Sequence, residues 1–159
     1  MDLKTTYLGL ELANPILCGA CPLGTSVDTI RQLADSGCAG VVLPSLFEEE
    51  ILAAARTHME IESAGAGFAE ASSYLPDPAG YHVGPDQYLE LIAAAKAAVK
   101  IPIIGSLNGT SAGGWTRYAQ KIEAAGADAL ELNVYFLPFE LAENGAAVEQ
   151  RAIDIVKGV

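Results

Sequence analysis

The chain has 159 residues, the length of one ordinary domain, and 51% of them are hydrophobic and 18% charged. This composition supports a folded core and excludes wholesale disorder. Acidic residues outnumber basic residues 20 to 9, which argues against binding to nucleic acids or anionic membranes because both need clustered Lys and Arg. No apolar run approaches the ~18 residues of a membrane span. The N-terminus also lacks the basic start and apolar stretch of a signal peptide, so we expect a cytoplasmic protein.

The first 37 residues predict a hairpin, a buried strand and a helix. Two short segments flank Gly9 and end before Asn14 and Pro15, as in a small β-hairpin. Residues 16–20 lack polar alternation, which is typical of a strand buried on both faces. Ser26 can cap the following helix and Gly37 suits its C-terminal end. Four apolar residues share one face of this helix: Val27, Ile30, Leu33 and Ala34.

The middle of the chain predicts a second buried strand at residues 40–45 and a partly exposed helix over residues 46–61. Residues 63–83 then break the pattern because they are rich in Gly, Ser, Ala and Pro. They also contain three aromatic residues, which a simple linker seldom holds: Phe68, Tyr74 and Tyr81. Long loops inside domains are usually functional, so we interpret this segment as a structured loop over a site.

The second half alternates helices and strands. A helix starts at Pro85, and a strand covers residues 101–106. Ser111 or Gly113 opens the next helix, and a strand at residues 127–133 and a last helix follow. The predicted inward residues of the three helices are Tyr88, Leu91, Ile92, Ala95 and Val99; Trp115, Tyr118, Ala119 and Ile122; and Val148, Ala152, Ile155 and Val156. Four strand–helix repeats predict an α/β fold with a parallel sheet, either doubly wound or part of an eight-stranded barrel.

Small polar residues follow the predicted strands, at the edge where both architectures bind ligands. These Gly, Ser, Asn and Cys residues would let a planar ligand approach the backbone and satisfy its donors and acceptors. Glu131 and Asn133 share one face of their strand by the two-residue period. Dinucleotide-binding and P-loop motifs are missing. His58 and His82 have no Cys or Asp at ligand spacing, so we expect both at the surface.

The Cys18-Gly-Ala-Cys21 stretch has the spacing of a redox or metal motif. A thioredoxin-type site opens a helix directly, whereas Cys18 lies within a predicted strand. A structural zinc site needs four ligands, and Cys38 is the one thiol left. We therefore predict no metal site and interpret the spacing as incidental, with a thiol or metal protein as the alternative. Three cysteines in such a chain do not indicate a disulfide framework.

Four segments carry a resemblance to a known family. They read LANPILCGA, GVVLPSLFEEE, IPIIGSLNGTSAGGW and AGADALELNVYFLP, and they span nearly the whole chain. In sequence and order they resemble dihydroorotate dehydrogenases, the FMN-dependent barrel enzymes of pyrimidine biosynthesis, and above all the bacterial dihydroorotate dehydrogenase-like proteins. The resemblance implies an FMN that lies across the strand tops of a TIM (β/α)8 barrel. The positions that match flavin-contacting residues of the family are Gly19, Ala20, Cys21, Ser45, Asn108 and Asn133.

The resemblance further implies that residues 1–159 form a single partial FMN-binding barrel domain. This would be the N-terminal half of the barrel, with about four βα units after a β-hairpin and the remainder missing. Such a half-barrel has two open edges, so we expect a homo-oligomer or a need for the missing C-terminal half. Neither nucleic acid nor a membrane is expected as a partner, whereas a small-molecule substrate is.

Two departures from the family bear on activity. The Lys of the family falls on Pro44, and its catalytic base, a Cys or Ser, falls on Phe136. Tyr135 is adjacent, but a phenol is a poor base at neutral pH, so no catalytic residue is identified. The implied function is an oxidoreductase that converts dihydroorotate, or a related dihydropyrimidine, to orotate. One alternative is a non-catalytic relative that acts in binding or assembly. Another is a phosphate-binding barrel of different chemistry, for which Glu131 alone is a weak basis.

Overall fold

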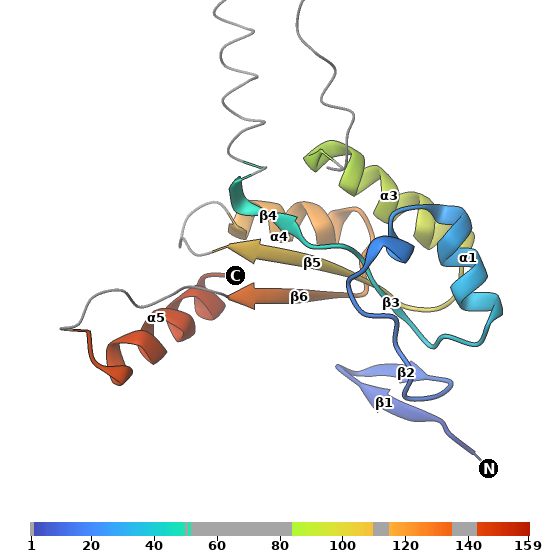
Figure 1. Cartoon of the computed structure of the whole chain (residues 1–159), viewed down its shortest axis with the longest axis horizontal. Coiled ribbons are helices and arrows are strands. Elements are labelled where there is room, and N and C mark those ends of the chain that lie inside the picture. Colours follow the sequence, from blue (N-terminus) through green and yellow to red (C-terminus); the bar gives the residue numbers. More distant parts are fainter. Residues whose placement is uncertain (1, 50, 52–83, 110–114, 135–142) are drawn as a thin grey trace, which may run out of the picture.

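The structure is a computed structural model, and it describes residues 2–49, 51, 84–109, 115–134 and 143–159. In this part of the chain a hairpin precedes strands that alternate with helices (Figure 1). The elements are β1 Thr5–Tyr7, β2 Leu10–Leu12, the 3-10 helix η1 Pro22–Gly24, α1 Val27–Asp35, β3 Val41–Val42, β4 Leu46–Phe47, α3 Pro85–Ala98, β5 Ile103–Gly109, α4 Trp115–Ala124, β6 Ala129–Val134 and α5 Gly145–Gly158. The predicted loop at residues 63–83 lies outside the described residues.

The N-terminal hairpin is confirmed. Strands β1 and β2 pair antiparallel, with Thr5 opposite Leu12 and Tyr7 opposite Leu10. Leu8 and Gly9 form the turn with φ angles of 52° and 77°. Two-residue hairpin turns favour positive φ at both central positions, which Gly9 adopts without a steric cost. The hairpin is a separate two-stranded sheet.

The main sheet is parallel, and its strands lie side by side in chain order. Ile104 of β5 pairs with Val42 of β3 on one edge and with Ala129 of β6 on the other. Leu107 pairs in the same way with Leu46 of β4 and with β6. The order therefore runs from β3 and β4 through β5 to β6.

Residues 16–18 extend this sheet beyond β3. The Ala39 N–H donates to the Ile16 carbonyl at 2.9 Å, and the Cys18 N–H donates to the Gly40 carbonyl at 3.0 Å. The Val42 N–H donates to the Cys18 carbonyl at 2.8 Å. Only Cys18 forms a β-bridge, so the predicted strand at residues 16–20 is shorter than expected. A sheet in chain order, without the reversal of a doubly wound sheet, is consistent with part of a barrel.

The predicted strand at residues 40–45 is interrupted. Only Val41 and Val42 form a strand, β3, and the next strand, β4, begins at Leu46 after Pro44. Pro44 has no N–H to donate, so a regular ladder with β5 cannot continue through it. The helix predicted from residue 46 is wrong at its start, because Leu46 and Phe47 form β4. Most of that helix lies outside the described residues.

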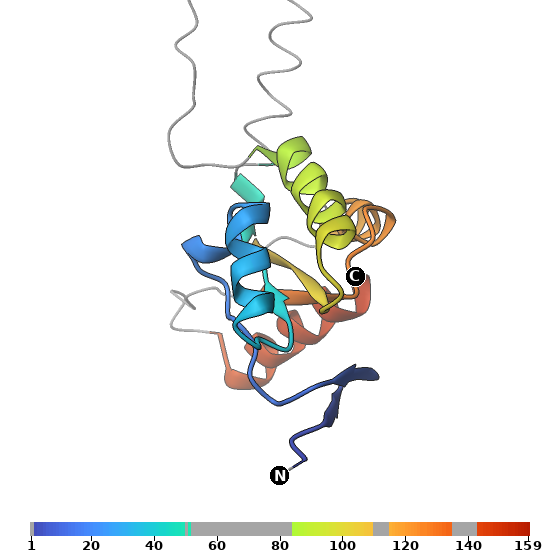
Figure 2. The same ribbon diagram turned by 90° about the vertical axis from the view of Figure 1, so that its right-hand side faces the viewer.

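Helices α1, α3 and α4 pack on one face of the sheet (Figures 1 and 2). The core between these layers is apolar, and its buried members are Ile30, Val41, Leu43, Leu46, Tyr88, Ile92, Ala95, Ile103, Leu107, Tyr118 and Ile122. The sequence placed most of the helical members correctly. Gly105 of β5 lets α4 approach, because a Cβ atom there would lie 2.6 Å from Cγ2 of Ile122.

The helix ends follow the predicted signals. The Ser26 hydroxyl accepts a hydrogen bond from the Thr29 N–H at 3.2 Å and caps α1. Gly37 and Gly126 follow α1 and α4 with φ angles of 92° and 99°. These left-handed positions end a helix at little cost when the residue is glycine.

Helix α5 lies against β6 through one side (Figure 1). Asn144 caps it by accepting from the Ala147 N–H at 2.9 Å, and Ile155 is buried. The inward position predicted for Val156 is wrong, because this side chain is 60% exposed. Ile153 and Val159 are exposed as well. In the described part of the chain, no helix is long and apolar enough to cross a membrane.

A carboxylate anchors the beginning of β5. One oxygen of Asp128 accepts from the Ile103 N–H at 2.7 Å. The Lys96 ammonium of α3 lies 2.7 Å from both oxygens of the same carboxylate. Asp128 therefore joins the end of α3, the start of β5 and the start of β6.

Candidate functional site

The face of the sheet opposite the helices carries a polar cluster, formed by Ser45, Ser106, Glu131, Asn108 and Asn133. Side chains alternate along a strand, and Gly105 and Leu107 face the helices, so Ser106 and Asn108 face away from them. The register pairs Ser106 with Glu131 and Asn108 with Asn133, which places two polar rows across β5 and β6. The Ser106–Glu131 row lies in the middle of the strands, and the Asn108–Asn133 row lies near their C-terminal ends, where parallel sheets bind ligands.

Three residues of the cluster form a hydrogen-bonded chain. The Ser106 hydroxyl donates to a carboxylate oxygen of Glu131 at 2.7 Å. The hydroxyl oxygens of Ser45 and Ser106 lie 2.8 Å apart. A hydroxyl has one proton, so when Ser106 donates to Glu131, Ser45 must be the donor in its hydrogen bond with Ser106. The lone pairs of Ser45 are then left to accept a hydrogen bond from a ligand.

The second row offers two amides. The Asn108 and Asn133 side chains have no hydrogen-bond partner among the described residues. Asn133 is exposed and Asn108 is half-buried. An amide supplies both a donor and an acceptor, so adjacent amides can read the alternating donors and acceptors of a heterocycle edge.

Tyr88 supports the cluster from the helix side. Its hydroxyl accepts from the Ser106 N–H at 2.8 Å and donates to the Ser106 carbonyl at 3.4 Å. These bonds take the place of strand pairing where the β3–β4 edge is interrupted at Pro44. Burial, partly offset by the Ser106 hydrogen bond and reinforced by the charge of Glu131, raises the pKa of Tyr88 to about 12. Tyr88 therefore stays neutral at physiological pH.

The segment at residues 19–21 leaves the sheet at the same edge as the polar cluster. It follows Cys18, and Cys21 is the residue before η1. Gly19 and Ala20 are exposed, and a Cβ atom at Gly19 would meet no atom within 4 Å. Gly19 is thus not required by packing, and its free space is available to a ligand.

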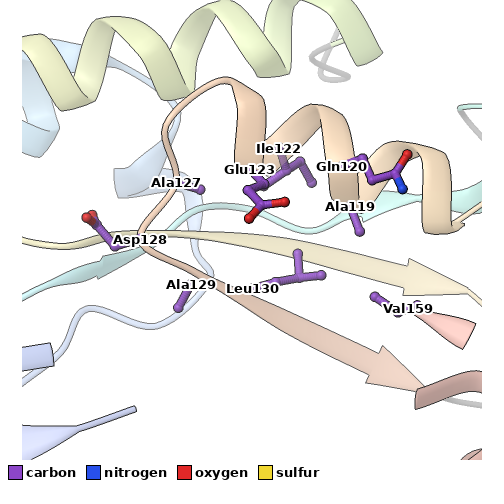
Figure 3. A pocket seen from close by; sticks show the side chains of 9 residues that line it. All are labelled: Ala119, Gln120, Ile122, Glu123, Ala127, Asp128, Ala129, Leu130 and Val159. Carbon is purple, nitrogen blue, oxygen red and sulfur yellow. The ribbon is translucent and has the colours of Figure 1, made fainter. Parts of the chain in front are cut away.

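A cleft of about 360 Å³ lies elsewhere, between α4 and the start of β6 (Figure 3). In Figure 3 the Leu130 side chain points toward α4, which confirms that this cleft opens on the helix face of the sheet. Gln120, Glu123 and Asp128 supply its polar groups, and Val159 closes one end. The cleft is therefore separate from the polar cluster.

The predicted site residues are partly brought together. The structure places Ser45, Asn108 and Asn133 on one sheet face and Glu131 with Asn133, as the strand period predicts. Ser106 is one of the small polar residues expected at the strand ends, but its hydrogen bonds with Ser45 and Glu131 were not predicted. Phe136 and Tyr135 lie outside the described residues. Within the described residues, no group of three His, Cys, Asp or Glu side chains could hold a metal ion.

Comparison with known proteins extends the family resemblance. The chain is 33% identical over 133 residues to "Dihydroorotate dehydrogenase B (NAD(+)), catalytic subunit" of Thermoplasma volcanium, covering 84% of this chain and 41% of the relative. The protein of the same name from Thermoplasma acidophilum is 30% identical over 134 residues, with the same two coverages. That of Methanosarcina acetivorans is 32% identical over 129 residues, or 79% of this chain and 38% of the relative. The chain thus spans about two fifths of the length of the curated relatives it matches.

The remaining comparisons concern the fold. No family model matches the chain. A solved structure described as "PhdJ bound to substrate intermediate" matches 91% of this chain and 40% of its own, with a TM-score of 0.51 and 13% sequence identity. This likeness supports the α/β fold alone. The homologues are dihydroorotate dehydrogenases, so the chain is similar to that oxidoreductase family in sequence and shares a parallel α/β architecture consistent with part of a barrel.

Proposed function

We propose that the chain is part of an FMN-dependent oxidoreductase that oxidises dihydroorotate, or a related dihydropyrimidine, to orotate. The observation that carries this proposal is the polar cluster that runs from the middle to the C-terminal ends of adjacent parallel strands, in a chain whose homologues are dihydroorotate dehydrogenases. The cluster is small, mostly uncharged and opposite the helices, as suits a planar heterocycle.

For the whole protein we propose an eight-stranded barrel, of which the chain contributes about four strand–helix units. The order of the parallel strands supports this, since residues 16–18, β3 and β4, β5 and β6 follow one another across the sheet in chain order. The relatives are named catalytic subunits of an NAD(+) enzyme. By extension we propose a companion subunit that passes electrons to NAD(+), and a cytoplasmic location. Assembly of the chain into homo-oligomers remains a prediction.

The residues of the cluster fit FMN. Gly19, Ala20 and Cys21 would contact the flavin through their backbone, and the open space at Gly19 permits a close approach. Asn108 and Asn133 would hydrogen-bond polar atoms of the ring, since neither amide has a partner among the described residues. Bound FMN would supply hydride acceptance to the reaction.

The chain's own residues would bind the flavin and the substrate and orient them. The Glu131 carboxylate fixes the proton of Ser106, which in turn directs the proton of Ser45, so that Ser45 presents an acceptor. From the helix side of the sheet, the Tyr88 hydroxyl bonds the backbone of Ser106 and holds this hydrogen-bonded series in place. The general base stays unassigned, because the family position falls on Phe136.

The second candidate is a flavin-binding relative without dihydroorotate oxidation. Pro44 favours it: a Cβ atom at Gly24 would lie 3.0 Å from Cδ of Pro44, so the Pro44 ring packs closely on η1. The family has a lysine at this position, and proline cannot supply its positive charge. An activity assay on dihydroorotate with the flavin-loaded protein separates the two candidates.

The binding test is a titration of the chain with FMN, in which the quenching of flavin fluorescence reports binding. We expect saturable binding that Asn133→Leu weakens at least tenfold, because the substitution removes a ring-facing amide. Gln32→Leu likewise replaces an amide by leucine, on the exposed surface of α1, and should leave binding unaltered. Lack of FMN binding by both the chain and the whole protein would contradict the proposal. Equal weakening by both substitutions would point to a general loss of folding, which circular dichroism would reveal.

A further inference from the structure

Two thiols meet at the edge of the sheet where the candidate site lies. The sulfur atoms of Cys18 and Cys21 are 3.7 Å apart, within van der Waals contact. Both cysteines are free and half-buried. The interpretation of their spacing as incidental does not anticipate this contact, because sequence spacing alone does not show which way the side chains point.

The backbone on each side of the pair is fixed. The Cys18 N–H and carbonyl bond to Gly40 and Val42 at 3.0 and 2.8 Å. Cys21 is extended, with φ −158° and ψ 169°, and its carbonyl accepts from the Gly24 N–H at 3.0 Å. Since both ends are held, the sulfurs stay close, and rotation of the side chains can bring them to the ~2.05 Å of a disulfide bond.

The third thiol is engaged elsewhere. The Cys38 thiol donates to the Gly40 carbonyl at 3.1 Å, and the Ile16 carbonyl lies 3.7 Å from the same sulfur. Cys38 therefore faces backbone acceptors and is the natural internal control. A metal ion is not the better explanation, because no group of three candidate ligands gathers within the described residues.

We propose that Cys18 and Cys21 form a redox-active dithiol, which a low-molecular-weight disulfide oxidises to an intramolecular disulfide. One cysteine thiolate attacks the external disulfide and releases one thiol, which leaves a mixed disulfide. The second thiolate then displaces the second external thiol and closes the Cys18–Cys21 bond. Overall, two cysteine thiols and one external disulfide become one protein disulfide and two external thiols, so electrons and protons balance. This inference does not depend on flavin binding.

The environment bears on the order of the two steps. Burial, then the hydrogen bond with Cys21 and the nearness of Cys21 and Cys38, raises the pKa of Cys18 to about 11. Thiolates are the attacking species, so the raised pKa of Cys18 disfavours this thiol as the first nucleophile. The resulting bond would bridge the turn that holds Gly19 and Ala20, next to the β-bridge of Cys18 with Val41.

The test uses Cys38→Ser, which keeps only the candidate pair. We expect glutathione disulfide to reduce its titratable thiols from two to none, with no glutathione left on the protein by mass spectrometry. The matched controls Cys18→Ser/Cys38→Ser and Cys21→Ser/Cys38→Ser each hold one thiol and should instead keep a glutathione adduct. Retention of both thiols, or stable adducts at both cysteines, would overturn the proposal.

A measurement on the unaltered chain guards against misfolding of the variants. Oxidised protein is alkylated, digested and mapped, and we expect the Cys18–Cys21 link with Cys38 alkylated. At pH 8, iodoacetamide should modify Cys18 slowly in the reduced protein, because its raised pKa leaves little thiolate. A Cys38-containing disulfide in this map would refute the assignment of the pair.

Discussion

The hydroxyl group of Tyr88 can be tested directly, because the structure gives it two hydrogen bonds to the backbone of one residue. It bonds the N–H and the carbonyl of Ser106 where the adjacent strand is interrupted. The Tyr88 side chain is 2% exposed and Ser106 is fully buried. Tyr88→Phe removes the hydroxyl, keeps the ring and leaves a buried N–H without a partner.

The cost follows from this loss. A buried donor left unsatisfied costs about 1–3 kcal/mol, and the ring itself still fills its site in the core. We expect the free energy of unfolding to fall by about 2 kcal/mol. For a chain of this length that corresponds to a decrease in Tm of roughly 4–8 °C. Urea denaturation followed by circular dichroism gives the free energy, and a thermal scan gives Tm.

Tyr118→Phe is the matched control. Tyr118 is a second tyrosine at the core, 6% exposed, with no hydrogen bond of its hydroxyl among the described residues. We expect a change within about 0.5 kcal/mol, as is usual for substitutions that remove no satisfied or packed group. Equal effects in the two variants, or no effect of Tyr88→Phe, would refute the claim that the Tyr88 hydroxyl replaces strand pairing.

Three further predictions concern stability. Gly105→Ala should lower the free energy of unfolding by about 1–3 kcal/mol in urea, because the new methyl overlaps Ile122; an unchanged midpoint would contradict the close packing of α4 on β5. Asp128→Ala should lower the free energy of unfolding by about 1–3 kcal/mol in the same assay, since it leaves the Ile103 N–H without its acceptor. The control Asp28→Ala removes an exposed ion pair with Arg31 and should have little effect. Neutral Tyr88 is favoured in the folded state, so the stabilisation is complete below about pH 10 and lost toward pH 12. This difference corresponds to roughly 3 kcal/mol, and the pH profile of Tyr88→Phe should lack it.

The sequence predicted the parts of the fold that depend on local chemistry. Capping by Ser26, the left-handed glycine at Gly37 and the buried stripe of α3 all follow from residue type and helical period. The interruption at Pro44 was open to prediction, since proline cannot donate in a ladder. The conversion of Leu46 into a strand residue was not, because it depends on pairing with Leu107, which lies far along the chain.

The candidate site was predictable in composition but not in its connections. Strand period places Glu131 and Asn133 on one face, and the structure agrees. The link from Ser45 through Ser106 to Glu131 depends on the register of three strands, which local sequence does not set. Contact between the Cys18 and Cys21 thiols likewise depends on side-chain directions.

The chain order of the sheet also has a consequence for how the protein reaches its folded state. Contacts between β5 and the start of β6 join residues 25 apart, and those between Ser45 and β5 join residues 61 apart. Loop-closure entropy grows only with the logarithm of length, so the longer closure costs about 0.8 kcal/mol more than the shorter one. The length of the stretch between β4 and α3 therefore adds little to the entropic cost of folding. That length could change during evolution with little penalty to assembly.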